Sequence, residues 1–326
     1  MERRAEPRLA PNWTTLAGAV EGVLAALGVP LPRHAVMGLT GCAFAFALAE
    51  SEAGAASPAG LHAFDTWRLG ERLARTGVRF ERFAPNDADP HEAIAWIASR
   101  TERGVPVIAW ALRLREWGII REVDQASETF TVDDLLSPEV GPTAAWADWP
   151  WGGERIDLLA PVEAVAAEDA AEDLVIDSLR DAAALLEGRI RPAGLPTGAE
   201  ALEAWARAFE EGRAIDRSGN AHCLAALLAA RSDGATYFSE LAEALPEASE
   251  PLQAAAEGLR REAAELAQLV TLFPYPAGGA GALASAGIRR IAAAALRRAA
   301  DWERQAAQRV RVALAVFDSG HRLSSG

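Results

Sequence analysis

Hydrophobic residues near the start of the chain recur with a helical period. Between residues 14 and 28 the apolar positions are three or four residues apart, which is the spacing of one face of an α-helix. Thr14 or Thr15 is typical of a helix cap, and Gly28 is typical of a helix end. The apolar positions are Leu16, Val20, Val23, Leu24 and Leu27. The pattern predicts a helix between these limits.

The rest of the first half mixes helical and strand patterns. Residues 63–77 have an amphipathic helical pattern, and Asp89 followed by Pro90 is typical of the start of another helix. Short apolar or alternating runs between polar turns predict strands. These strands are expected at 78–85, 106–113, 117–124, 128–134 and 153–162. Helices followed by a mostly antiparallel sheet indicate an α+β domain.

Strand patterns give way to helical patterns after residue 162. Helices are predicted at 163–187, 198–211, 219–230, 233–244, 250–273 and 282–317. In the last two, apolar residues step by three and four, as they do in packed helical bundles. We therefore predict an α+β domain over residues 1–162 and an all-α helical bundle over residues 163–326.

Composition narrows the classes of partner and chemistry. The 326 residues carry a formal net charge of −14, and all 32 basic residues are arginine. An acidic chain is a poor partner for nucleic acid, and a chain without lysine has no Schiff-base lysine. The two cysteines are too few for a disulfide framework, and no 18-residue apolar run or signal peptide is present. We expect a cytoplasmic protein that does not act at a membrane.

Candidate catalytic groups are few. Cys42 is either a small buried residue or a nucleophile with His34 or His62 as its base. Glu116 and Asp124 flank one predicted strand and so lie at its opposite ends, which favours solvated ends over joint acid–base work. Residues 86–93 hold Asp87, Asp89 and His91, but they read as a capped helix start rather than a metal loop. The sequence predicts no metal site and no cofactor.

Three further stretches each allow a structural or a binding role. Trp146, Trp149 and Trp151 either pack on a core or form an exposed aromatic platform. Asn220 and His222 lie at a predicted helix start, where they either serve the cap and the core or bind a polar ligand. An arginine stripe with heptad spacing is either a solvated bundle flank or faces a second subunit in a homodimer. Its members are Arg290, Arg297, Arg304 and Arg311.

The order of these pieces resembles a known family. The segments at 12–28 (NWTTLAGAVEGVLAALG), 36–46 (VMGLTGCAFAF), 104–124 and 130–135 resemble the papain-like domain of the butirosin biosynthesis protein H family. That domain is more distantly similar to the cysteine peptidases that process bacteriocin leaders. The helical half resembles the segment that follows in these relatives. Its matching landmarks are 194–210, 219–241 and 272–276.

The resemblance implies a papain-like fold whose catalytic positions have changed. The family's nucleophilic Cys falls on Leu16 or Ala19, and the His of its G-H-A-F motif falls on Cys42. The strand that would present a catalytic His reads Glu116-Trp117-Gly118, and only Asp124 remains of the family's acidic turn. The resemblance therefore implies a degenerate enzyme scaffold.

On this basis the leading prediction is a non-catalytic protein that binds a small amine- or peptide-like molecule. The vacated cleft would have Leu16 as its floor, Thr14 or Thr15 at its rim and Trp110 or Trp117 as a wall. A second candidate site contains Asn220 and His222. One alternative is a thiol-dependent amide hydrolase or acyltransferase that uses Cys42. Another is a structural protein that binds a partner through its helical half.

Overall fold

The chain folds into two compact units. The computed structural model describes residues 6–50, 56–57, 60–85, 89–164 and 171–324. One unit comprises Met1–Val36 and Arg68–Ala170, and the other comprises Met37–Trp67 and Ala171–Gly326. This division differs from a single boundary at 162, because the segment 37–67 packs with the helical half rather than with the sheet. The mixed composition of helices and antiparallel strands confirms the α+β fold class.

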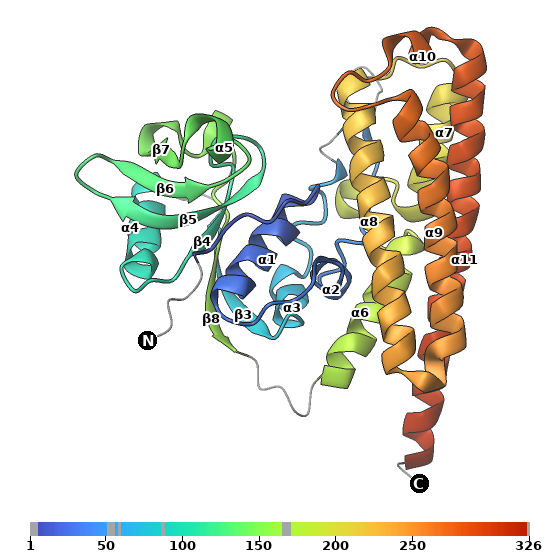
Figure 1. The fold of residues 1–326 in the computed structure, drawn as a ribbon, viewed down its shortest axis with the longest axis horizontal. Helices are drawn as coiled ribbons and strands as arrows, with labels where there is room; N and C mark the ends of the chain where they lie inside the picture. The colour runs from blue at the N-terminus through green and yellow to red at the C-terminus, as the bar shows by residue number, and fades with distance from the viewer. Residues whose placement is uncertain (1–5, 51–55, 58–59, 86–88, 165–170, 325–326) are drawn as a thin grey trace. The chain divides into compact units, whose positions relative to one another are not determined.

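The first unit is built on an antiparallel six-stranded sheet with the order β3-β8-β4-β5-β6-β7 (Figure 1). Its strands are β3 (Val78–Phe83), β4 (Val107–Trp110), β5 (Trp117–Asp124), β6 (Thr129–Asp133), β7 (Thr143–Ala145) and β8 (Leu158–Ala164). β5 lies at the predicted residues, and its first four residues are all buried. Strands buried on both faces read as continuous apolar runs, which explains the sequence WGII.

Helices cover both faces of this sheet. They are α1 (Thr15–Ala26), α3 (Leu69–Ala74), α4 (Pro90–Thr101) and the short α5 (Ser137–Val140). α1 and α4 both pack on β4 and β5 (Figure 1). Ile120 packs in the cluster that includes Ile94 and Ile97 of α4, and the backbone N–H of Trp117 donates to Thr15 of α1. Asp89 caps α4 as predicted, because its carboxylate accepts from the His91 N–H at 2.9 Å.

Two glycines of α1 let the N-terminal segment cross the helix closely. The Ala10 N–H donates to the Gly18 carbonyl at 3.1 Å. A Cβ at Gly18 would lie 2.4 Å from the Ala10 carbonyl oxygen, and one at Gly22 would lie 1.6 Å from the Arg8 carbonyl oxygen. Both are far inside contact distance, so only glycine fits at these crossings.

We expect Gly22→Ala to lower the free energy of unfolding of the first unit by about 1–3 kcal/mol, because the backbone at Arg8 must move away. Gly70→Ala, in α3, is the matched control. A Cβ there meets nothing within 4 Å, so stability should be unchanged or rise by up to about 1 kcal/mol. Urea unfolding of both variants measures the difference, and equal stabilities would contradict the crossing geometry.

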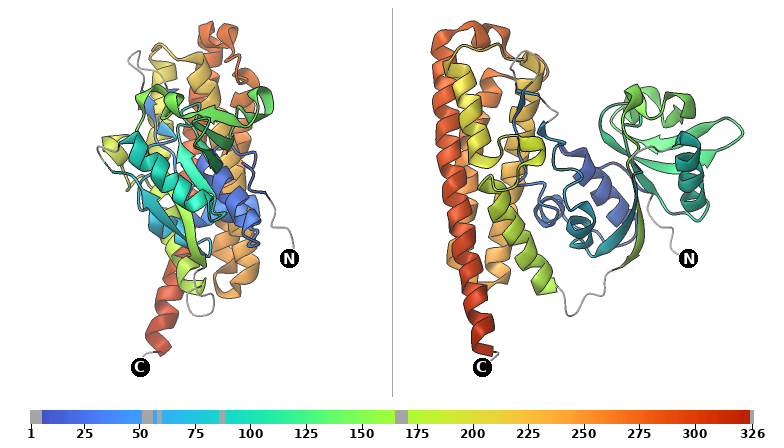
Figure 2. Two further views of the ribbon diagram at one scale, coloured as in Figure 1. Left: turned by 90° about the vertical axis from the view of Figure 1, so that its left-hand side faces the viewer. Right: turned by 180° about the vertical axis from the view of Figure 1, so that it is seen from behind.

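The second unit is a bundle of long helices that run side by side (Figure 2). They are α6 (Ala171–Leu186), α7 (Gly198–Glu210), α8 (Arg217–Ala244), α9 (Ser249–Leu272) and α11 (Ala286–Ser324), with the short α10 (Ala280–Ala284) before the last. The helix α2 (Arg33–Leu39) and the two-stranded sheet β1 (Ala49–Glu50) and β2 (Ala56–Ser57) precede them.

One predicted break in the bundle is wrong. The break expected at 231–232, between the helices predicted at 219–230 and 233–244, is absent, because α8 is continuous through these residues. A Cβ at Gly234 would lie 3.0 Å from both Leu259 and Phe44. The glycine therefore serves close packing between α8 and its neighbours instead of ending a helix.

The arginine stripe of α11 pairs with acidic residues of its own unit. Arg297 binds Glu210 with its Nη2 and Oε2 atoms 2.5 Å apart, Arg304 binds Glu203, and Arg311 binds Glu187. Glu187 directly follows α6, and Glu203 and Glu210 both lie on α7. All three pairs are partly exposed, so each adds little to stability. Of the two interpretations of the stripe, contacts within the bundle account for these three arginines.

Candidate functional site

The start of α1 is tied to β5 by a threonine hydroxyl. Thr15 Oγ1 accepts from the Trp117 N–H at 3.0 Å and donates to Glu116 Oε2 at 2.5 Å. Thr14 is the N-cap residue, but its side chain makes no capping hydrogen bond, so the predicted hydroxyl cap is not formed. Thr15 is only 2% exposed. Its hydroxyl acts here as a link between a helix and a strand.

The residues predicted to line a vacated cleft are packed in the interior of the first unit. Leu16, Trp110 and Trp117 are all buried, and the two indoles contact each other with ring centroids 5.6 Å apart. Trp110 Nε1 also donates to Glu154 Oε2 at 3.2 Å. Burial of each large apolar side chain stabilises the fold by about 1.5–3 kcal/mol, which favours packing of these residues against one another over lining an open cleft. These residues therefore form core, and a hollow in this unit lies elsewhere.

That hollow, of about 530 Å³, lies at the surface beside the end of β4. It is lined by Arg113, Ala147, Asp148, Pro150, Trp151, Gly152 and Gly153. The Trp151 N–H donates to the Ala111 carbonyl at 2.9 Å, which anchors the loop to β4. The Trp151 side chain is 41% exposed, and Asp148 is exposed as well.

The tryptophan-rich loop has both buried and exposed indoles. Trp149 is buried in the sheet core, where its Nε1 donates to the Trp110 carbonyl at 3.2 Å, and Trp146 packs partly against the same core. Trp151 is exposed at the hollow. The sequence showed that tryptophans are concentrated in this loop. It did not show which of them are buried, because burial depends on how the folded loop directs each side chain.

The guanidinium of Arg113 is fixed at the edge of the hollow. Its Nε and Nη2 bind both oxygens of Asp134, at 2.9 and 2.5 Å, and its Nη1 donates to the Gly141 carbonyl at 2.9 Å. This bidentate pair already neutralises the arginine. Asp148 and Trp151 are therefore the hollow's groups best suited to contact a charged ligand.

Asp124 and Glu116 lie at the two ends of β5, as the sequence predicted. The Asp124 carboxylate accepts from the N–H groups of Ala126 and Ser127, at 2.9 and 3.1 Å. The Ser127 side chain and these N–H groups lower the pKa of Asp124. Asp124 therefore shapes the turn to β6, and Glu116 anchors α1.

The predicted second site, at the start of α8, divides into a cap, a core contact and a surface contact. Asp216 caps the helix by accepting from the Gly219 N–H at 2.5 Å. Asn220 is buried, and its Oδ1 accepts from Trp205 Nε1 at 3.0 Å. Burial raises the pKa of the neighbouring Cys223 thiol to about 12. Asn220 and Cys223 thus belong to the bundle core.

His222 is half-buried beside Tyr275, with ring centroids 5.5 Å apart. Desolvation lowers the pKa of His222, and the nearby His62 lowers it further. His62 Nδ1 lies 3.1 Å from Asp65 Oδ2, so a carboxylate orients that imidazole. The i, i+3 spacing of His62 and Asp65 was visible in the sequence, but their proximity to His222 was not.

Cys42, the candidate nucleophile, is 7% exposed in the turn after α2 and belongs to the second unit. Asp87 lies outside the described residues. Within the part of the chain that the structure describes, no group of three or more His, Cys, Asp or Glu side chains is placed to hold a metal ion.

Sequence reasoning missed a buried ionic cluster in the second unit. Arg231 of α8, Glu262 of α9 and Glu303 of α11 bind one another without exposure to solvent. The three residues lie on separate helices, so no sequence spacing indicates their contact.

Comparison with known proteins adds no assignment: no protein-family model matches the chain, and no curated protein matches it. Among the described helices, none combines the length and the apolar character that a membrane crossing requires.

Proposed function

We propose that this protein binds a small amine-bearing molecule, free or at the end of a peptide, in the hollow of the first unit. The proposal is carried by the exposed Trp151 indole and the Asp148 carboxylate, which line the same hollow. An indole face attracts an ammonium group by about 0.5–2 kcal/mol, and a carboxylate complements its charge. The net charge of −14 raises the local concentration of cations.

The proposal retains the degenerate papain-like scaffold that the resemblance implies and assigns it no covalent step. Two observations support it: packed apolar residues fill the position of the family's nucleophile, and Cys42 is buried. Compared with the vacated cleft, the hollow is displaced to the loop between β7 and β8. The proposal also places the protein in the cytoplasm.

The test uses two probes of similar size and opposite charge, butylammonium and butyrate, added to the full-length protein. Binding is followed by the indole N–H signals of ¹⁵N-tryptophan-labelled protein, with the Trp151 signal assigned from Trp151→Phe. We expect butylammonium, and not butyrate, to shift this signal. Asp148→Asn should weaken binding about tenfold by this signal, which corresponds to one lost contact of about 1.4 kcal/mol. Trp151→Ala lacks the signal, so its binding is measured by isothermal titration calorimetry beside the unaltered protein, and we expect a similar loss.

Two variants control for exposure and for charge. Trp13→Ala removes an indole that is 38% exposed but does not line the hollow, and Glu122→Gln removes an exposed carboxylate of β5. Both should bind the probe as the unaltered protein does. Equal shifts by the two probes, or equal losses in the Glu122 and Asp148 variants, would reject an ammonium site at the hollow.

A further inference from the structure

The buried ionic cluster has one cation and two carboxylates. Arg231 Nε binds Glu262 Oε1 at 2.9 Å, and Arg231 Nη2 binds Glu303 Oε1 at 3.0 Å. Arg231 Nη1 donates to the Ala43 carbonyl at 2.7 Å. All three side chains are fully buried. Each of the three guanidinium nitrogens therefore donates to an acceptor.

The second oxygen of each carboxylate is also buried. Glu262 Oε2 and Glu303 Oε2 accept no hydrogen bond from any group that the structure describes. With both carboxylates ionised, the cluster would hold a net charge of −1 away from water. An uncompensated buried charge costs several kcal/mol, and such groups take up a proton instead.

The charged groups that act on Glu262 are all in the cluster. Burial raises its pKa well above the usual range, the Glu303 carboxylate raises it further, and Arg231 opposes this only in part. Both carboxyl groups bind the same guanidinium, each through its Oε1 atom. Two buried carboxyl groups on a single cation favour holding one proton, because the second negative charge has no partner.

We propose that Glu262 and Glu303 form a proton-binding site that holds one proton between them at neutral pH. The proton comes from water when the second unit folds, because both glutamates are ionised in the unfolded chain. The cluster is then neutral: one guanidinium, one carboxylate and one carboxylic acid that donates to it. The hydrogen bond from Arg231 to Ala43 extends this site to the segment 37–67.

The direct test is the infrared spectrum of the full-length protein at pH 7. A protonated carboxyl group gives a C=O band separate from that of carboxylates. We expect this band in the unaltered protein and expect its loss in Glu262→Gln and in Glu303→Gln. In each variant the remaining glutamate pairs with Arg231 as a carboxylate, and the new amide donates in place of the proton.

The linked test is the pH dependence of urea unfolding, followed by circular dichroism. A group whose pKa is higher in the folded than in the unfolded state adds to the stability of the fold. This contribution is complete below the unfolded-state pKa and is lost as pH rises to the folded-state pKa. The unfolding constant should therefore rise with pH more steeply in the unaltered protein than in Glu262→Gln. The extra rise is up to tenfold per pH unit, from about pH 4.5 up to the raised pKa of Glu262.

Glu257→Gln makes the same change on an exposed face of α9 and should keep the steep pH dependence. Absence of the carboxyl band in the unaltered protein would overturn the proposal. So would its persistence in both glutamine variants, because the proton would then belong to another group. If one glutamine variant does not fold, the other and the spectrum of the unaltered protein still decide the question.

Discussion

Arg231→Met should lower the free energy of unfolding of the second unit by about 3–5 kcal/mol at pH 7. The change removes the only cation of the buried cluster and leaves two carboxyl groups without their partner. It also leaves the buried Ala43 carbonyl without its donor, which adds to the loss. Urea unfolding followed by circular dichroism measures the effect, since the second unit supplies most of the helices.

The pH dependence and a matched variant show whether Arg231→Met loses stability through its charge or through lost packing. At low pH both carboxyls of Arg231→Met can be protonated, so the deficit should shrink as pH falls. Arg261→Met removes a half-exposed arginine that pairs with Glu257, and it should cost about 1 kcal/mol or less. If the Arg231 and Arg261 variants lose the same stability, the cluster is not the buried ion pair described above.

A triple variant tests whether the complete cluster adds to the free energy of unfolding or only makes its members depend on one another. Arg231→Met, Glu262→Leu and Glu303→Leu together replace the cluster by apolar side chains of similar volume. Such replacements of complete buried networks are often neutral or stabilising by 1–4 kcal/mol. We expect the triple variant to recover most of what Arg231→Met loses, although each of its changes breaks an ion pair in isolation.

The sequence predicted local structure well where one residue decides it. Asp89 and Pro90 mark the start of α4, and the apolar run that opens residues 117–124 belongs to β5. These features depend on neighbours within a few residues, so the local sequence pattern is enough to predict them. The break expected at 231–232 shows the limit: α8 continues through it, and the nearby Gly234 packs against Phe44 and Leu259, which are distant in sequence.

Contacts between distant segments explain what the sequence did not predict. The segment 37–67 packs with the bundle because Gly38 admits the ring of Tyr237 and because the Ala43 carbonyl binds Arg231. Glu262 and Glu303 occur in helices rich in exposed glutamate, and nothing local distinguishes them from a solvated face. For the candidate site, the aromatic loop was recognised, but the residues of the expected cleft became core.

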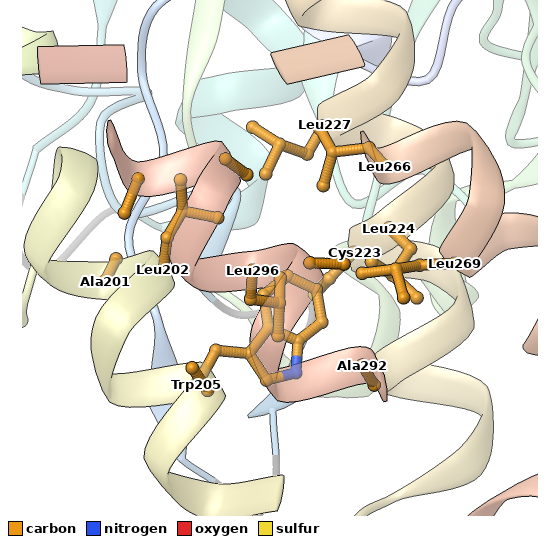
Figure 3. Close-up of a cluster of buried hydrophobic side chains, with 14 of the residues drawn as sticks. Ala201, Leu202, Trp205, Cys223, Leu224, Leu227, Leu266, Leu269, Ala292 and Leu296 are labelled. Atoms are coloured by element: carbon orange, nitrogen blue, oxygen red, sulfur yellow. The ribbon is translucent and has the colours of Figure 1, made fainter. Parts of the chain in front are cut away.

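Trp205→Ala should also be strongly destabilising, by about 3–5 kcal/mol. The indole is 1% exposed and lies at the centre of the bundle core, among Leu202, Cys223 and Leu296 (Figure 3). Its removal leaves a cavity that helices on several sides cannot close. It also removes the donor to Asn220 Oδ1, whose Nδ2 has no partner among the described residues.

Two variants divide this loss into packing and hydrogen bonding. Trp205→Phe keeps most of the apolar volume and the stacking on Phe46, now 5.8 Å between ring centroids, but leaves Asn220 Oδ1 unpaired. It should cost about 1–3 kcal/mol, the penalty for a buried acceptor. Trp302→Ala removes a half-exposed indole under the Arg261 guanidinium, and it should cost about 1 kcal/mol. Urea unfolding ranks the three, and a Trp205→Ala loss no larger than that of Trp302→Ala would show that this indole does not organise the core.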